Sequence, residues 1–82
     1  MFLHLGKETI IKQEEMIAMI SLESILKKKS IEDICKSLNI NDNIIDIADK
    51  NKKSLILVKE KDKLKGYITN ISTNTLAKRI LW

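Results

Sequence analysis

The sequence predicts an α+β fold, a small and mostly antiparallel sheet with one central helix and one C-terminal helix. Two observations predict it: several short runs rich in Ile and Val suit strands, and two segments have the apolar spacing of helices. The chain has 82 residues, no Pro, and 44% hydrophobic residues. This is enough for one small core. Since no linker rich in Gly, Ser or Pro interrupts the chain, residues 1–82 are expected to form a single domain.

Short apolar runs separated by polar segments predict the strands. The first two runs are separated by Gly6 and two polar residues, which is the spacing of a small hairpin. The third and fourth are joined by a polar loop, and the last follows a second loop at residues 61–65. The predicted strands are residues 2–5, 9–11, 44–47, 54–58 and 67–71.

Helices are predicted at two places. Ser30 opens a capping box of the Ser-x-x-acid form, so a helix is expected to begin there. Its apolar residues recur at i, i+3, i+4 and i+7, which places Cys35 on the buried face. Ser72 or Thr73 can cap the final helix. The apolar side of that helix consists of Leu76, Ile80 and Leu81, and Lys78 and Arg79 lie near its end.

Residues 13–29 give a mixed signal. They contain several good helix formers, but their apolar residues follow no single period. Propensity alone favours a helix in this segment.

Basic charge is concentrated in the middle of the chain. The net charge is −3 over residues 1–49, +5 over residues 50–65 and +2 over residues 66–82. Lys50-Asn51-Lys52-Lys53 falls in the predicted loop between two strands, where its lysines could meet phosphates.

A second set of lysines recurs at every other position. Because residues two apart point to the same side of an extended chain, these lysines would form a basic row wherever the chain stays extended. A nucleic-acid surface and an edge strand protected by lysines explain the row equally well. The set is Lys59, Lys61, Lys63 and Lys65.

The sequence lacks the residues that several classes of function require. One His and one Cys cannot complete a zinc site, and no phosphate-binding loop or paired nucleophile and base is recognisable. We therefore expect no enzyme, no metal and no cofactor. His4 is expected to be structural, and Glu14 and Glu15 to be solvated surface residues. With only three aromatic residues, binding of single strands by stacking is disfavoured, and duplex phosphates are the better candidate ligand.

The opening apolar run is short and soon followed by a charge, so we do not expect a secretory signal there, and no stretch approaches the roughly 20 apolar residues of a membrane span. A cytoplasmic protein without membrane contact is expected.

The order and spacing of five motifs resemble those of the bacterial extracellular matrix regulatory proteins of the RemA/RemB family, with the RemB branch closer. The resemblance covers almost the whole chain, and the last motif is the most specific. The motifs are Phe2-Leu3-His4-Leu5-Gly6, residues 16–23 (MIAMISLE), Ile45-Asp46-Ile47, residues 53–58 (KSLILV) and residues 67–79 (YITNISTNTLAKR).

The resemblance implies a strand at residues 15–22, in place of the helix that propensity favours. It also implies that protomers assemble into a ring-like homo-oligomer. RemA-type proteins activate biofilm matrix genes by binding duplex DNA, so a DNA-binding transcriptional regulator is the implied function.

Site residues are carried over position by position. Two RemA loop arginines align on Asn51 and Lys52, so only Lys52 keeps the charge, with Lys50 and Lys53 beside it. A further RemA arginine falls on or near Glu15, where the charge is reversed. Lysine is a flexible point charge without the planar fork of arginine, so phosphate contact fits these residues better than base reading does.

We therefore predict a homo-oligomer that binds duplex DNA phosphates through Lys50, Lys52 and Lys53. The alternative is an oligomeric structural or adaptor protein that binds a protein partner, with lysines that serve solubility and edge protection.

Overall fold

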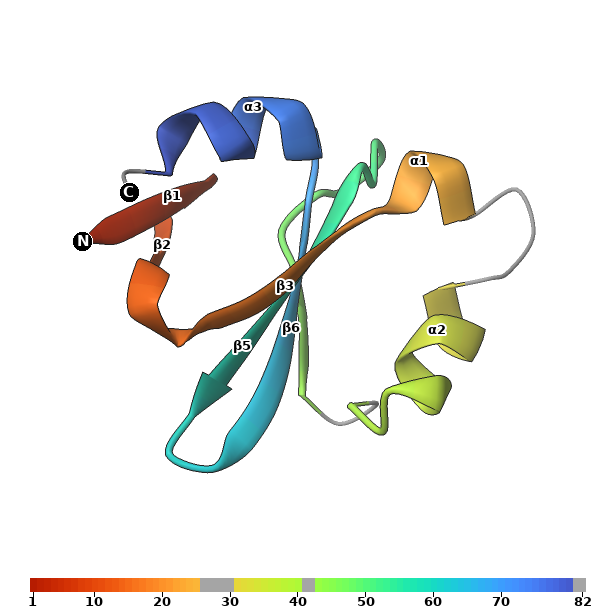
Figure 1. The fold of residues 1–82 in the computed structure, drawn as a ribbon. Helices are drawn as coiled ribbons and strands as arrows, with labels where there is room; N and C mark the ends of the chain where they lie inside the picture. The colour runs from red at the N-terminus through yellow and green to blue at the C-terminus, as the bar shows by residue number, and fades with distance from the viewer. Residues whose placement is uncertain (26–30, 41–42, 81–82) are drawn as a thin grey trace.

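A four-stranded sheet forms the centre of the molecule, with strand order β3-β5-β6-β4 (Figure 1). The computed structural model describes residues 1–25, 31–40 and 43–80. The two pairs β3/β5 and β5/β6 are antiparallel, and β4 pairs with β6 in parallel, so the predicted α+β fold with a mostly antiparallel sheet is confirmed. The elements are β1 Phe2–Gly6, β2 Thr9–Lys12, a 3-10 turn at Gln13–Glu15, β3 Met16–Ser21, α1 Leu22–Ile25, α2 Ile31–Ser37, β4 Ile44–Asp46, β5 Ser54–Glu60, β6 Lys63–Thr69 and α3 Thr73–Arg79.

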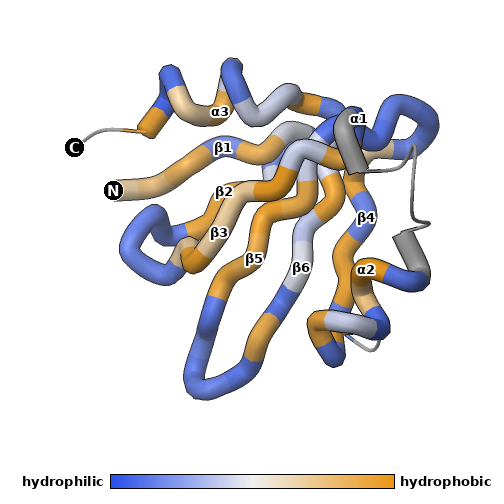
Figure 2. Tube along the Cα trace, turned by 45° about the vertical axis from the view of Figure 1, so that its right-hand side comes forward, coloured by the Kyte–Doolittle hydropathy of each residue, from blue (hydrophilic) through white to orange (hydrophobic). Residues whose placement is uncertain are grey.

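Strand β5 is the core strand because both of its faces are covered. Residues 54–58 are all buried, and successive side chains point to opposite faces of the sheet. Leu55 and Leu57 belong to one apolar cluster, which includes Cys35 and other residues around α2. Ile56 and Val58 belong to a second cluster with residues of β1, β2 and α3. In Figure 2 the tube of β5 is orange along its central part and blue toward the β5–β6 turn.

The hairpin β1–β2 and helix α3 lie together on one side of the sheet, as Figure 1 shows. Thr69 of β6 is fully buried; its hydroxyl donates to the Leu5 carbonyl at 2.5 Å and accepts from the Ile71 N–H at 3.2 Å. Ser72 caps α3 by accepting from the Thr75 N–H at 3.2 Å, and Leu76 is buried. These contacts fix the hairpin and the helix to the last strand.

The helix that propensity favours at residues 13–29 is wrong for its first half. Residues 26–29 of the predicted helix lie outside the described residues. Residues 16–21 form β3, within the strand at 15–22 that the resemblance implies, and α1 adds one helical turn at Leu22–Ile25. The reason is packing: Met19 contacts one apolar cluster while Ala18 and Ile20 contact the other, and a register shift between Met16 and Ala18 brings Met16 to the side of Met19. Side chains that must reach both clusters need the two-residue period of a strand.

Helix α2 occupies the position predicted for the central helix, with Ile34 and Cys35 buried. The predicted cap Ser30 lies outside the described residues, as does Leu81 of the final helix.

Gly66 allows close packing between β6 and its neighbours. A Cβ atom at this position would lie 2.9 Å from Ile44 Cδ1, 3.0 Å from Ile40 Cδ1 and 3.1 Å from Leu55 Cδ1. Since these distances are shorter than ordinary carbon contacts of about 3.5–4.0 Å, the glycine is what lets Ile40 and Ile44 close over the strand.

Candidate nucleic-acid interface

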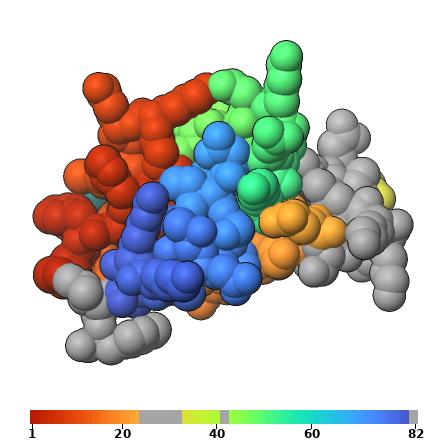
Figure 3. Space-filling model, turned by 90° about the horizontal axis from the view of Figure 1, so that it is seen from above, coloured from red at the N-terminus to blue at the C-terminus, as the bar shows by residue number. Residues whose placement is uncertain are grey.

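The loop that holds the predicted site residues runs from the end of β4 to the start of β5. Its two ends are hydrogen-bonded to β6: the Ile47 N–H donates to the Ile68 carbonyl at 2.8 Å, and the Lys53 N–H donates to the Thr69 carbonyl at 3.0 Å. The Lys53 carbonyl accepts from the Leu22 N–H of α1 at 2.8 Å. In Figure 3 this loop, in green, projects from the rim of the molecule next to α1, in orange. The basic residues are therefore carried on a protruding loop with fixed ends.

Lys52 is held inside the loop. Its Nζ donates to Asp46 Oδ2 at 2.7 Å and to the Asp49 carbonyl at 2.9 Å. Asp46 Oδ1 accepts from the Ala48 N–H at 2.9 Å, so both carboxylate oxygens are occupied. Only 30% of the Lys52 side chain is exposed.

The pKa of the Asp46 carboxyl reflects this arrangement. Partial burial acts to raise the pKa, but hydrogen bonds from Lys52 and from the Ala48 N–H, together with the nearby positive charge of Lys52, outweigh burial and lower it. Asp46 is therefore ionised throughout the neutral range.

Lys50 and Lys53 have a different environment. Lys50 is exposed and Lys53 is partly buried, and neither side chain has an ion-pair partner within the described ranges. Together with Asn51, Lys52 and Glu23 they line a shallow, open depression of about 350 Å³. The structure thus brings the three predicted site residues together on one surface.

Acidic groups lie close to this surface, and the sequence did not reveal them. Asp46 pairs with Lys52, and Asp49 pairs with Lys7 from the β1–β2 turn. Glu23 lines the depression beside the lysines. The local excess of positive charge is therefore smaller than the run of lysines in the sequence indicates. Lys7 and Asp49 are 42 residues apart, so only the folded chain brings them together.

The second set of lysines does not form a row. A tight turn at Lys61 and Asp62 reverses the chain where a longer loop was expected. In the antiparallel register Lys59 pairs with Leu64, while Lys63 pairs with Glu60. Directly paired residues share a face, so Lys59 lies on the face opposite to Lys63. Lys65 lies on the same face as Lys63, and its Nζ is 3.2 Å from Glu60 Oε2.

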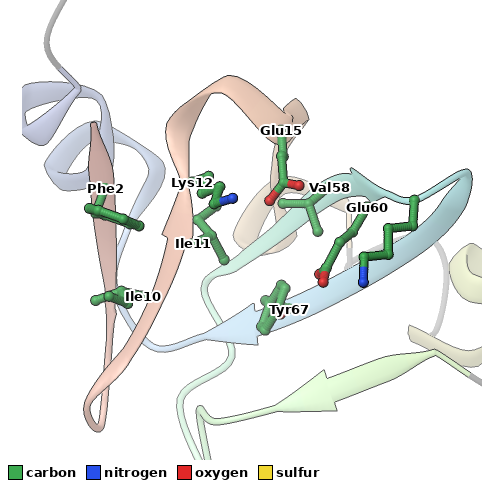
Figure 4. Close-up of a pocket in the computed structure, with 9 residues that line it drawn as sticks. Phe2, Ile10, Ile11, Lys12, Glu15, Val58, Glu60 and Tyr67 are labelled. Carbon is green, nitrogen blue, oxygen red and sulfur yellow. The ribbon is translucent and has the colours of Figure 1, made fainter.

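A separate hollow of about 280 Å³ lies between the hairpin and the β5–β6 pair (Figure 4). Phe2 and Ile10 border it from the hairpin, and Tyr67 projects from β6. The exposed fractions of Phe2 and Ile10 are 64% and 48%, which is high for such apolar side chains. Lys12, Glu15, Glu60 and Lys61 supply charges of both signs around the opening.

Neither His4 nor Cys35 lines either of these two surfaces, although His4 is paired with Ile10 in the hairpin. His4 is exposed, and its backbone carbonyl accepts from Arg79 at 3.3 Å. Cys35 is buried, and burial raises the pKa of its thiol.

Within residues 1–25, 31–40 and 43–80 there is no group of three or more His, Cys, Asp or Glu residues arranged to bind a metal. No helix in the same ranges is long and apolar enough to cross a membrane.

Comparison with known proteins gives no match, either to models of protein families or to curated sequences. The RemA/RemB resemblance therefore stays a prediction.

Proposed function

We propose that this chain is a DNA-binding transcriptional regulator of extracellular matrix genes that acts in the cytoplasm as a homo-oligomer. Lys50, Lys52 and Lys53 bind the phosphates of duplex DNA. The observation that carries the proposal is the loop itself: it protrudes, its ends are fixed to β6 and α1, and it presents Lys50 and Lys53 without acidic partners among the described residues.

The chemistry of this loop suits phosphate contact. An ammonium group replaces condensed counterions on the DNA backbone, and the released ions supply the binding free energy. Because the loop ends are held by hydrogen bonds to the sheet, little backbone freedom is lost on binding. Lysine has no fixed fork for a base edge, so the affinity depends mainly on the number of contacts.

Repetition in an oligomer would multiply these contacts. Two or three lysines on one protomer bind weakly, but several protomers on one DNA segment raise the effective concentration of each loop. Strand β3 supports self-association, because it is an edge strand and residues 16–21 contain no charged side chain. Ile17, at 56% exposure, adds an apolar side chain on this strand.

The alternative is an oligomeric adaptor that binds a protein partner and no DNA. The hollow of Figure 4 favours this second function, since its exposed Phe2 and Ile10 and its mixed charges are typical of protein contact surfaces. Acidic neighbours of the loop favour it as well.

Substitution of the three loop lysines separates the two functions. The variant Lys50→Glu/Lys52→Glu/Lys53→Glu should lose affinity for a labelled duplex in fluorescence anisotropy. A matched control, Lys59→Glu/Lys61→Glu/Lys63→Glu, makes the same change in net charge at the far end of the β5–β6 hairpin (Figure 1). We expect the control to retain most of the affinity. Equal losses in both variants would mean that the loop is not the DNA surface.

A further inference from the structure

The three loop lysines are not equivalent, because an acidic residue holds one of them. Asp46 ends β4, and the next residue, Ile47, is hydrogen-bonded to β6. The Ala48 N–H fixes Asp46 Oδ1 at 2.9 Å, which leaves Oδ2 directed at Lys52 Nζ, 2.7 Å away. Strand β4 and the Ala48 N–H therefore fix the position of the Asp46 carboxylate, and the Lys52 side chain reaches it from the loop.

Lys52 has only one ammonium N–H left for a phosphate. Two of the three ammonium donors already bond, one to the Asp46 carboxylate and one to the Asp49 carbonyl. A phosphate oxygen is negatively charged, like the Asp46 carboxylate, and binds an ammonium group at a similar distance. The two would therefore compete for Lys52. Lys50 faces no such competitor in the described structure, because it is exposed and unpaired.

We propose that Asp46 is a positioning residue that competes with phosphate for Lys52 and so limits the affinity of the loop for polyanions. This inference rests on the proposed function, since it assigns the regulation of affinity within the same site. In the resting loop, Lys50 and Lys53 are the available cations, and Lys52 contributes less than they do because the Asp46 carboxylate offsets its charge and occupies one of its donors.

Asp46→Asn is the direct test. The amide oxygen can still accept from the Ala48 N–H, so the turn is retained while the charge that holds Lys52 is removed. Ion pairs at a protein surface contribute modestly to stability. Removal of this competition should therefore raise duplex affinity by up to about fivefold for each engaged protomer. Each added phosphate contact should also steepen the salt slope by about 0.9.

Asp62→Asn is the matched control. It changes the net charge by the same amount, and Asp62 is an exposed residue in the β5–β6 turn, at the opposite end of β5 from the loop (Figure 1). Its φ of 66° is one that Asn adopts readily, so the turn should be preserved. We expect this variant to change affinity and salt slope much less than Asp46→Asn does.

These measurements test the competition by Asp46 separately from DNA binding by the loop. Tighter and more salt-sensitive binding by Asp46→Asn than by Asp62→Asn supports the competition. Equal behaviour of the two variants, or weaker binding by Asp46→Asn, overturns it. If the wild-type oligomer binds no duplex at all, the proposed function fails. Elution from heparin then decides the inference: later elution of Asp46→Asn supports it, and co-elution with Asp62→Asn overturns it.

Discussion

At the scale of single residues, the pair formed by Asp46 and Lys52 has a measurable pH dependence. The pKa of Asp46 is lowered in the folded protein relative to its ordinary value of 3.8. A carboxyl whose folded pKa is lowered stabilises the fold above the ordinary value, and this contribution disappears as the pH falls through the folded pKa. The pair should therefore matter near neutral pH and vanish in acid.

Lys52→Gln tests this assignment. Loss of the ammonium should raise the pKa of Asp46, because partial burial then has less opposition. The measurement is a pH titration followed by NMR of the side-chain carboxyl carbon in both proteins. A pKa that does not change in Lys52→Gln would show that the two residues are not paired in solution.

Thr69 joins the hairpin to the sheet through one buried hydroxyl. Thr69→Val keeps the shape of the side chain but leaves the Leu5 carbonyl without its donor and the Ile71 N–H without its acceptor. We expect a loss of about 1–3 kcal/mol in the free energy of unfolding, measured by urea denaturation. Thr9→Val is the control, since Thr9 lies in a strand and its side chain makes no hydrogen bond to any residue that the structure describes. Similar losses in both variants would contradict this role of Thr69.

At the scale of elements, both hairpin turns use residues that do not favour their backbone conformation. Lys61 and Asp62 have φ values of 50° and 66°, and Lys7 and Glu8 have φ values of 45° and 63°. Two-residue turns with positive φ at both positions strongly prefer Asn-Gly, because other side chains are strained there.

The double variant Lys61→Asn/Asp62→Gly should therefore stabilise the protein. Relief of the strain is expected to add about 1 kcal/mol to the free energy of unfolding. Lys63→Asn, just after the turn in β6, is a control that should give no gain. A double variant no more stable than the wild type in urea denaturation would mean that the turn geometry is wrong.

Most elements could be predicted from local patterns, and the exceptions have a common cause. The hairpin, α2, β5 and α3 follow from apolar spacing and capping, which depend on neighbouring residues. Strand β3 could not be predicted from its own propensity, since contact with both apolar clusters decides its form.

The candidate site shows the same limit. Its lysines are visible as a run in the sequence, but the pairing of Lys52 with Asp46 depends on the shape of the loop, and the pairing of Asp49 with Lys7 depends on tertiary structure. A charge run predicts where a basic surface can form. It does not predict how much of that charge is already neutralised.

At the scale of the whole molecule, self-association should depend on the exposed side of β3. Ile17→Lys places a charge on an edge strand that has none, which opposes pairing with a second chain. We expect a lower molecular mass by light scattering than for the wild type. Ala77→Lys, at an exposed position of α3, is the control and should leave the mass unchanged. An unchanged mass in Ile17→Lys would exclude this strand from the interface.

The central claim is that repeated loops on one assembly bind duplex phosphates. The most direct measurement is fluorescence anisotropy of the wild-type protein with a labelled duplex at several salt concentrations, after light scattering has fixed the oligomer mass. The account predicts micromolar or tighter binding whose logarithm falls steeply and linearly with the logarithm of salt concentration, by about 0.9 for each phosphate contacted. A well-formed oligomer that binds no duplex even at low salt would contradict the claim and leave the adaptor function.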